Sequence, residues 1–411
     1  MRSITTTCCV VGGGPAGMML GLLLARSGIA TVVLEKHADF LRDFRGDTVQ
    51  PSTMELLAEL DLLDAFLELP HQRMARIQLE VGGRRFRGPD LSRLPVRCGF
   101  IAFVPQWDFL DFLAGAARRY PDFDLRMSVE ATDIVEDDRG VVRGVRASTP
   151  TGLLEVRADL VIGADGRHST IRERAGLPTR EFGVPIDVLW FRLPRPADGP
   201  SEPALGRIHD GRLMVTIDRG DYYQCGFVIA RGGNETLRRG GLDAFRAQIV
   251  ALAPFLADVA SELRDWNQVK LLTVRIDRLE RWHRPGLVCI GDAAHAMSPA
   301  GGVGINLAIQ DAVAAANAIV PPLRAGDLRT GHLARIERRR RWPVIVTQWM
   351  QIVFHRRLFG GDPESGPIDV PAPLALLLRA SASLLRRLVG RIVGLGLRPE
   401  HVRTAEAPRA V

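Results

Sequence analysis

The first forty residues alternate apolar runs with a glycine cluster. Residues 8–11 are all apolar and end at Gly12, and an apolar helical pattern follows the glycines as far as Arg26. Residues 30–34 form a second apolar run, which ends at Glu35. Short apolar runs bounded by glycine or polar residues are typical of buried strands. The pattern therefore predicts a strand, a helix and a second, parallel strand, which together form a βαβ unit.

Two later apolar runs predict strands that end close to an acid. Residues 160–163 lead to Asp165, after which we expect a turn and a helix capped by Ser169. Residues 287–290 lead to Asp292, and a glycine-rich loop and another helix follow. Both segments are predicted to pass from strand to helix, as the first unit does.

The pattern changes in the middle of the chain. Residues 184–274 form short runs of alternating apolar and polar residues rich in aromatics, which predict an antiparallel sheet interrupted by a helix at 242–263. From Asn317 to about Leu397 the sequence is rich in arginine and predicts helices, broken at 361–374. The arginines at 338–341 are predicted to lie on a solvated helix face.

Composition sets limits on class and location. With 411 residues, 46% of them hydrophobic, the chain can build two domains or one elaborated α/β unit. No apolar run approaches the roughly 18 residues of a membrane span, so we expect neither a span nor a signal peptide, and a cytoplasmic location. The five cysteines have no metal-ligand spacing, which predicts buried thiols and no metal site.

The net charge of +7 does not predict a nucleic-acid partner. Nearly all basic residues are arginines, since Lys36 and Lys270 are the two lysines of the sequence. The densest cluster, 338–341, has no aromatic residues between its arginines that could stack on bases.

The glycine cluster is the first candidate binding site. Gly12, Gly14 and Gly17 have the GxGxxG spacing that allows a tight turn, a close approach of backbone to pyrophosphate, and close packing of helix on strand. Glu35 follows about twenty residues on, where an acid can accept hydrogen bonds from ribose. This combination favours a dinucleotide over a glycine turn without a ligand. The residues predicted to surround it are Gly12, Gly14, Pro15, Ala16, Gly17, Glu35 and Lys36.

Three ordered motifs identify a family resemblance. They are CVVGGGPAGMMLGLLLARSGIATVVLEK at 9–36, LVIGADGRHSTIRERAG at 160–176 and LVCIGDAAHAMSPAGGVGINLAIQDA at 287–312. Over about residues 8–311 the chain resembles the single-component FAD-dependent monooxygenases of the para-hydroxybenzoate hydroxylase family. The resemblance implies FAD, NADPH or NADH as a transient reductant, O2, and hydroxylation of an aromatic ring through a flavin C4a-hydroperoxide.

The resemblance also assigns site residues. Asp292 would accept from ribityl or ribose hydroxyls, and the 299–304 loop would present backbone N–H groups to the flavin pyrimidine edge. The family has glutamine where this chain has Val303, so only the backbone role carries over at that position. Arg45 matches an arginine near FAD and the nicotinamide route. The further cofactor contacts implied are Arg45, Gln106, Asp165, Asp292, Gly302, Gly304, Ile305 and Asn306.

Because the flavin carries the chemistry, no catalytic residue is assigned outright. The candidates are Arg45, Tyr223 and Pro299, whereas His295 is interpreted as a side chain that orders its loop. The residues expected to line the substrate pocket are Trp190, Arg192, Met214, Tyr223 and Phe227.

The implied fold class is α/β, with a doubly wound, Rossmann-like FAD-binding domain, an inserted antiparallel β-sheet substrate domain and a helical C-terminal segment. We expect the FAD-binding domain at 1–75, 98–183 and 277–330, the substrate domain at 76–97 and 184–276, and the helical segment at 331–411.

Two alternative functions are weighed against aromatic hydroxylation. A flavin-dependent halogenase needs a lysine over a tunnel from the flavin, and neither Lys36 nor Lys270 has that position. A quinone- or lipid-pathway flavin hydroxylase or reductase on a membrane surface would use the leucines and arginines of 374–398, for which a docked helix is the favoured interpretation. The expected substrate is a largely hydrophobic, fused-ring aromatic, and the chain is expected to be a monomer or homodimer.

Overall fold

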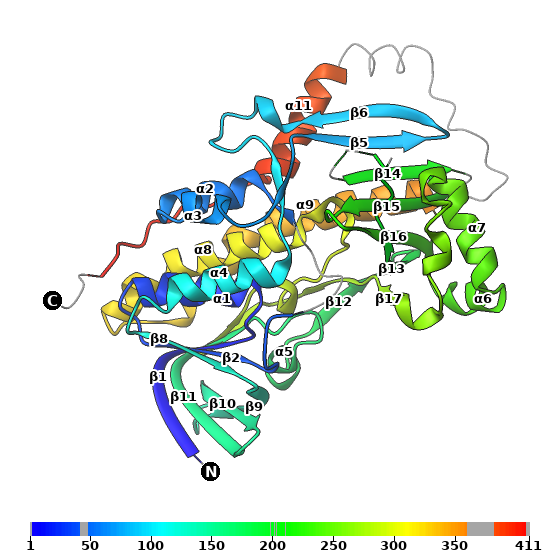
Figure 1. Cartoon of the computed structure of the whole chain (residues 1–411). Coiled ribbons are helices and arrows are strands. Elements are labelled where there is room, and N and C mark those ends of the chain that lie inside the picture. Colours follow the sequence, from blue (N-terminus) through cyan, green and yellow to red (C-terminus); the bar gives the residue numbers. More distant parts are fainter. Residues whose placement is uncertain are drawn as a thin grey trace.

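An eight-stranded sheet forms the frame of the first domain (Figure 1). The computed structural model describes residues 2–41, 48–197, 199–200, 202, 204–209, 211–359 and 382–407. The sheet runs in the order β19-β20-β11-β1-β2-β8, with β10 and β9 continuing from β11. The strands are β1 (Arg2–Val11), β2 (Thr31–Glu35), β8 (Phe123–Met127), β9 (Glu130–Glu136), β10 (Val142–Thr149), β11 (Gly152–Gly163), β19 (His283–Arg284) and β20 (Leu287–Cys289). The pairs β20–β11, β11–β1, β1–β2 and β2–β8 are parallel, as a doubly wound domain requires.

Both faces of this sheet are covered, because its strands are apolar on both sides. On one face, Val10 and Val33 join a large apolar cluster with α1 (Pro15–Arg26), α4 (Gln106–Ala117) and α8 (Gly304–Arg324). The shorter helices α2 (Pro51–Glu59) and α3 (Leu63–Leu67) complete this layer. The opposite face packs against β9, β10 and α5 (Thr170–Arg174), with Trp282 as its largest fully buried side chain.

A second sheet of seven strands forms the other domain, in the order β17-β13-β16-β15-β14-β5-β6. Its strands are β5 (Arg76–Val81), β6 (Arg84–Asp90), β13 (Ile186–Pro194), β14 (Ala204–His209), β15 (Arg212–Asp218), β16 (Tyr222–Ala230) and β17 (Lys270–Thr273). The antiparallel sheet expected within 184–274 is present, and one parallel pair, β14–β5, joins it to the earlier hairpin. The helices α6 (Asn234–Arg239) and α7 (Leu242–Leu252) lie beside it, and α7 covers its outer face.

Two crossing strands connect the domains. β12 (Thr179–Phe182) and β18 (Ile276–Leu279) pair antiparallel where the chain leaves and re-enters the first domain. β3 (Thr48–Val49), β7 (Ile101–Phe103) and β4 (Gln72–Met74) form a small sheet, and its β7 shares an apolar cluster with the second sheet. Single 3-10 turns are η1 (Leu91–Arg93), η2 (Pro254–Leu256), η3 (Ala260–Glu262), η4 (Trp266–Gln268), η5 (Gly291–Ala293) and η6 (Ala300–Gly302).

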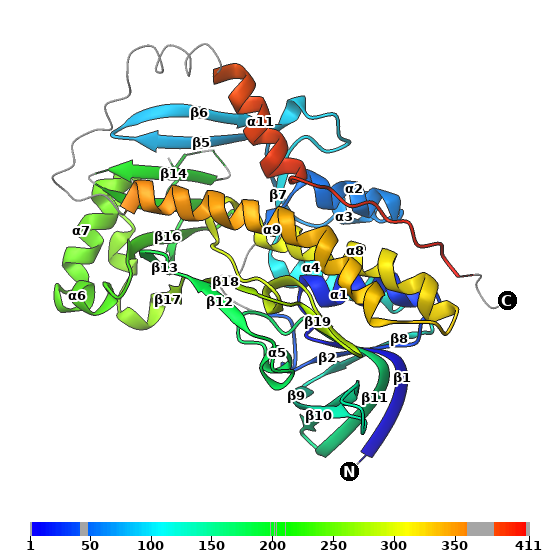
Figure 2. The ribbon, with the colours of Figure 1, turned by 180° about the vertical axis from the view of Figure 1, so that it is seen from behind.

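Of the described C-terminal residues, those of two segments, 330–359 and 382–395, are helical, as predicted, whereas 396–407 form no helix. α9 (Thr330–Phe359) crosses the back of both domains, as Figure 2 shows. α11 (Ala382–Leu395) packs against β6, α2 and η1, which supports the docked-helix interpretation for its described residues. The break expected at 361–374 lies outside the described residues.

The prediction of a solvated arginine face at 338–341 is wrong for Arg340. This side chain is 1% exposed, and its Nε donates to Asp311 Oδ1 at 2.9 Å. Arg341 pairs with Glu337 at 2.5 Å, whereas Arg338 is exposed. A run of four arginines in a helix can include one buried side chain, because the helical period of 3.6 residues turns about one residue in four toward the core.

The five cysteines are buried, as expected. Burial raises the pKa of Cys9 to about 12 and moves the pKa of Cys8, Cys225 and Cys289 still further above its usual range. Burial also raises the pKa of Cys98. These thiols therefore remain protonated at neutral pH.

One helical stretch of the described residues, Ala300–Arg324, is long and apolar enough to cross a membrane. Within its most apolar window, 78% of the residues are buried inside the structure. Such burial is typical of a core helix, and the fold is consistent with a soluble protein.

We expect Gly286→Ala to destabilise the fold more than the matched control Gly326→Ala. Both glycines have positive φ, +77° and +65°, which costs an alanine about 1–2 kcal/mol. A Cβ on Gly286 would also overlap the carbonyl oxygen of Val142, whereas none of the surrounding atoms comes within 4 Å at Gly326. Overpacking adds about 1–3 kcal/mol. Urea unfolding of the two variants measures the difference, and equal losses would contradict the steric argument.

Candidate functional site

Four loops meet at one edge of the large sheet. Because β20, β11, β1 and β2 are adjacent and parallel, their carboxyl ends point the same way. Gly12 follows β1, Glu35 ends β2, Asp165 follows β11 and Asp292 lies in η5 after β20. The edge at which an open α/β sheet binds its ligand is thus lined by the residues that the sequence singled out.

The glycine loop leaves an open cradle at the start of α1. Gly12 has φ +108°, and a Cβ there would overlap the Ala164 carbonyl oxygen of the neighbouring strand. A Cβ on Gly17 would overlap the carbonyl oxygen of Gly12. By contrast, a Cβ on Gly14 would meet no atom within 4 Å, and no side chain caps α1. The first N–H groups of α1 therefore face open space, which suits an anionic group.

The Glu35 carboxylate lies against this loop. Its Oε2 accepts from the Gly13 N–H at 2.9 Å, and its Oε1 accepts from the His37 N–H at 3.1 Å. Two backbone donors thus fix the carboxylate at the end of β2, beside the cradle. Lys36, the next residue, is exposed.

The Asp165 carboxylate is turned toward α5. It accepts from the Ser169 hydroxyl at 2.5 Å and from the Ile171 N–H at 3.0 Å, and Ser169 caps the helix by accepting from the Arg172 N–H at 3.0 Å. The prediction that Ser169 is a cap is confirmed. Burial raises the pKa of Asp165, and these hydrogen bonds oppose the rise. Asp165 therefore shapes the loop between β11 and α5.

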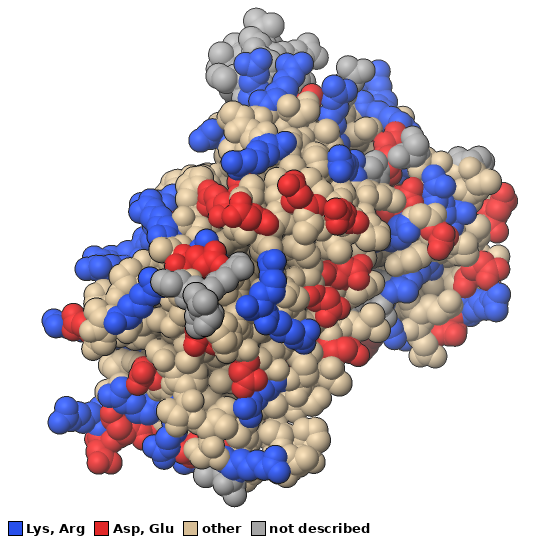
Figure 3. All heavy atoms as spheres, turned by 60° about the vertical axis from the view of Figure 1, so that its left-hand side comes forward, with Lys and Arg blue, Asp and Glu red and all other residues tan. Residues whose placement is uncertain are grey.

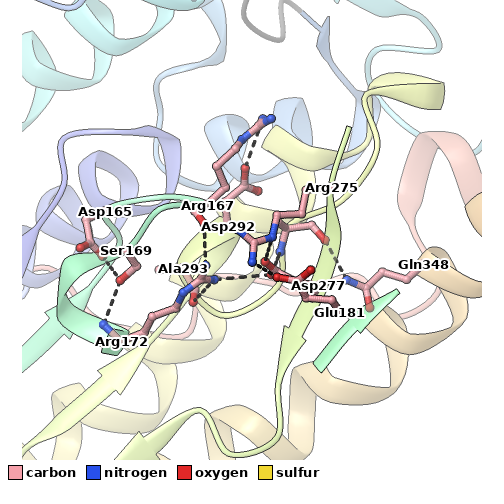
Figure 4. A network of polar contacts seen from close by, with 11 residues as sticks. Asp165, Arg167, Ser169, Arg172, Glu181, Arg275, Asp277, Asp292, Ala293 and Gln348 are labelled. Carbon is pink, nitrogen blue, oxygen red and sulfur yellow. Dashed lines mark hydrogen bonds and ion pairs between the residues drawn. The ribbon is translucent and has the colours of Figure 1, made fainter. Parts of the chain in front are cut away.

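Asp292 faces Arg167 across the edge. Arg167 Nη2 lies 3.8 Å from Asp292 Oδ2, and about a third of each side chain or less is exposed (Figure 4). This ion pair joins the loop after β11 to the loop after β20. Sequence reasoning did not single out Arg167, although it follows Asp165-Gly166 directly.

A buried network lies behind this pair, where the crossing strand β18 meets η5. Asp277 is fully buried, with Arg172 at 3.5 Å on one side and Arg275 at 3.0 Å on the other (Figure 4). The Ala296 N–H donates to Asp277 at 3.2 Å, and the Gln348 amide donates to the Asp277 carbonyl at 2.7 Å. The loop after η5 is thereby fixed to the connection between the domains.

The side chain of Asn306 is committed to the protein. Its Oδ1 accepts from the Gln50 N–H at 2.8 Å and from the Thr53 hydroxyl at 2.7 Å, and its Nδ2 donates to the Thr48 carbonyl at 3.1 Å. These bonds attach α8 to the start of α2. A contact of Asn306 with a cofactor would therefore use its backbone rather than its side chain. Of the other expected residues of this loop, Gly302 ends η6, and Gly304 and Ile305 begin α8, which no side chain caps. Pro299 is exposed.

Three further residues complete the set. Arg45 lies outside the described residues. Gln106 is the first residue of α4 and is partly exposed. His295 is 1% exposed with its Nε2 2.5 Å from Asp311 Oδ2, which is the geometry of a side chain that orders its loop.

The five expected substrate residues divide between the two faces of the second sheet. Directly paired residues share a face, and Met214 pairs with Phe227, which pairs with Leu189. Met214, Phe227 and Tyr223 accordingly join the core beneath α7. The expectation that all five line one pocket is therefore not met, since strand alternation turns these three away from Trp190.

Trp190 and Arg192 lie on the face toward the first domain. Trp190 is half-buried and packs against two apolar clusters, one of which contains Ile101 and Phe103 of β7. Arg192 lies at the strand end, with its guanidinium 5.0 Å from the Tyr222 ring centroid. Along β13, β15 and β16, Arg192 is the one charged residue on this face.

Sequence reasoning missed the polar residues that hold the site from behind. A signal was present for Asp311, which is a lone acid in the apolar and alanine-rich run of α8. Such an acid needs a buried partner, and Arg340 supplies it. The residues missed are Thr48, Gln50, Thr53, Arg167, Asp277, Asp311, Arg340 and Gln348.

Known proteins with similar sequences or structures agree with this geometry. A family model described as FAD binding domain matches residues 5–347. The 6-methylpretetramide 4-monooxygenase of Streptomyces rimosus is 35% identical over 387 residues, 93% of this chain and 92% of that protein. The 12-dehydrotetracycline 5-monooxygenase/anhydrotetracycline 6-monooxygenase of Streptomyces rimosus subsp. rimosus is 29% identical over 321 residues, 74% of this chain and 60% of that protein.

A solved structure shows the same fold. The p-nitrophenol 4-monooxygenase of Pseudomonas putida aligns with a TM-score of 0.75 and 21% identity, over 96% of this chain and 95% of that chain. The open cradle at α1 and the carboxylates at the sheet edge fit an FAD whose pyrophosphate meets a helix N-terminus. The chain belongs to the FAD binding domain family and is an FAD-dependent monooxygenase of the single-component aromatic hydroxylase type.

Proposed function

We propose that this monooxygenase hydroxylates a largely hydrophobic, fused-ring aromatic substrate, with NADH or NADPH as the transient reductant. One atom of O2 enters the ring as a hydroxyl group and the other leaves as water, while the nicotinamide donor supplies two electrons. The apolar sheet face around Trp190 carries the proposal, because it offers ring contacts and few cations, namely Arg192 on β13 and Lys270, which pairs with Trp190 from the edge strand β17.

The apolar surface is continuous across three strands. Leu213 and Val215 of β15 and Val188 of β13 share the face of Trp190, and Phe103 of β7 packs against the same region. A large planar ring system gains about 25 cal/mol per Å² of apolar area that it buries. A small anionic acid would instead need a cation held beside the reacting ring. Arg192 is stacked on Tyr222, and Lys270, which pairs with Trp190, is exposed on the edge strand β17.

The names of the sequence relatives support a substrate with several fused rings. They specify 6-methylpretetramide and anhydrotetracycline as the compounds on which those enzymes act. The more similar enzyme spans almost the same length as this chain. We therefore place the substrate among polycyclic phenols of this kind, with hydroxylation beside an electron-donating group.

We also propose which residues hold FAD. The N–H groups of Gly14, Ala16 and Gly17 would meet the pyrophosphate, with Pro15, which has no N–H, at the first helical position. Glu35 would meet the ribose, and Asp292 the ribityl or ribose hydroxyls. The backbone from Gly302 to Ile305 would donate to the flavin pyrimidine edge, where the N-terminal dipole of α8 favours negative charge. When bound, FAD supplies the redox chemistry that activates O2. The chain's part is to orient the ring, exclude water through the apolar face and stabilise charge at the flavin edge.

We also propose a cytoplasmic location and a function without a nucleic-acid partner. A cytoplasmic monomer or homodimer is consistent with the buried Ala300–Arg324 helix. On the face shown in Figure 3, acidic and basic side chains are interspersed over most of the surface, which supports a function without nucleic acid. Because α11 packs against β6, α2 and η1, we do not favour an enzyme that binds a membrane surface.

The halogenase alternative is not favoured. Lys36 is exposed at the end of β2, and Lys270 is exposed at the start of β17, the edge strand of the second sheet. Lys270 pairs directly with Trp190 and shares its face, but as an exposed residue of an edge strand it does not show the enclosed position that a halogenase lysine needs.

The proposed flavin contacts predict that Glu35→Ala and Asp292→Ala each weaken FAD binding. A charge-assisted hydrogen bond contributes about 1.5–3 kcal/mol, which corresponds to roughly ten- to a hundredfold in the dissociation constant. Asp124→Ala on β8 is the control, since Asp124 pairs with Arg126 on the same strand. Fluorescence titration of the apoprotein measures the constants. Values equal to the control in folded variants would remove these two assignments.

The substrate proposal is tested by NAD(P)H consumption and product mass over a series of phenols. We expect coupled turnover with tricyclic and tetracyclic phenols, weaker turnover with bicyclic ones, and uncoupled or absent turnover with a simple hydroxybenzoate. The order follows the apolar area that each ring system can bury. Efficient coupled turnover of the hydroxybenzoate alone would overturn the proposal.

Trp190→Ala should raise KM for the fused-ring substrate by roughly tenfold or more, the equivalent of about 1.4 kcal/mol, and leave FAD affinity unchanged. Trp190→Phe should recover most of the loss. Phe227→Leu is the matched control, because Phe227 lies on the opposite face under α7 and should lower stability rather than change KM. An unchanged KM in Trp190→Ala would exclude this face as the substrate wall.

A further inference from the structure

The last described residues, 396–407, form a strap along the first domain (Figure 2). The Thr404 carbonyl accepts from Arg26 of α1 at 2.9 Å, and the Val402 N–H donates to Glu59 of α2 at 2.7 Å. The Arg403 N–H donates to Asn317 of α8 at 2.9 Å. The strap therefore joins helices that are far apart in the sequence.

Glu400 is the buried centre of the strap. It is 6% exposed, and its Oε1 accepts from Arg339 Nε at 2.6 Å and from Arg340 Nη1 at 3.3 Å. Its backbone N–H donates to Gln310 Oε1 of α8 at 2.5 Å. Arg340 also donates to the Arg398 carbonyl at 3.0 Å. One arginine of α9 thus binds the strap through a side chain and a backbone oxygen.

The other side of Arg340 reaches the loop after β20. Its Nε donates to Asp311 Oδ1 at 2.9 Å, and Asp311 is fully buried. Asp311 Oδ2 in turn accepts from the Gly291 N–H at 3.1 Å and lies 2.5 Å from His295 Nε2. Gly291 directly precedes Asp292. A continuous set of buried contacts therefore runs from Glu400 through Arg340 and Asp311 to the backbone beside Asp292.

A buried ionic chain of this kind holds its members together. A charge taken out of water is tolerated only while each partner is in place, and removing one leaves another uncompensated. His295 and Arg340 keep the pKa of Asp311 below its ordinary value although burial alone would raise it. Asp311 is therefore a fixed anion that holds the Gly291 N–H, and the strap supports it from behind.

We propose that Asp311 is a positioning residue for the flavin, and that the C-terminal strap acts on the flavin site through Glu400 and Arg340. Asp311, Arg340 and Glu400 are all buried, and Asp311 reaches the loop through the Gly291 N–H. Together they set the backbone from which Asp292 projects. Because coupling between two sites is reciprocal, FAD that binds at the sheet edge stabilises the strap as much as the strap stabilises the bound FAD. The inference rests on FAD binding and not on the proposed substrate.

Hydrogen exchange in the unaltered protein is the first test. We expect peptides covering 398–407 to exchange more slowly in the FAD-loaded protein than in the apoprotein. Peptides from α7, which cover the outer face of the second sheet, should not change. Equal exchange in the strap with and without FAD would overturn the proposal, and this measurement requires no variant to fold.

Variants then identify the route. Glu400→Gln should raise the FAD dissociation constant roughly tenfold, the equivalent of one charge-assisted hydrogen bond, and shift the visible flavin spectrum. Glu406→Gln is the matched control on the same strap, since Glu406 pairs with Arg26 at 3.6 Å and accepts from the Tyr120 hydroxyl at 3.4 Å. Arg340→Lys should retain more affinity than Arg340→Met. If Glu400→Gln lowers the melting temperature but leaves FAD affinity and spectrum at control values, the strap is a structural brace and the proposal fails.

Discussion

Parallel backbone pairing of β1 with β2 and β11 is the interaction on which the site depends. It aligns the carboxyl ends of neighbouring strands, so that loops from residues 12, 35 and 165 meet although the chain between them is long. β20 adds the loop of Asp292 by pairing with β11. No side chain could collect these loops unless the hydrogen-bonded register had already brought them to one edge.

The first βαβ unit was predictable because its signals are local. Tight turns, an apolar helix and an acid at the strand end all lie within 36 residues, and each constrains the next. The roles of Met214 and Phe227 were not predictable from the sequence. A buried strand is apolar on both faces, and alternation alone does not tell which face meets the other domain. The pairing of Phe227 with Leu189 on the neighbouring strand decides which face these side chains occupy, and this pairing joins residues far apart in the sequence.

The hydrogen-bond and ion-pair partners of the buried polar residues were equally unpredictable from the sequence. Asp311 and Arg340 lie 29 residues apart on different helices, and their pairing depends on how α8 packs against α9. Asn306 looked like a cofactor contact because it follows the glycine loop, yet its amide attaches α8 to α2. In both places tertiary packing decided the partner of the polar side chain.

The buried cysteines have a consequence for an enzyme that handles oxygen. Any monooxygenase that reduces O2 without a substrate in place releases peroxide into its own surroundings, and peroxide attacks thiolates. The pKa of Cys9 is about 12, and none of the five thiols is exposed. The protein therefore presents no ready thiolate to the oxidant that it can generate, and uncoupled turnover should spare its cysteines.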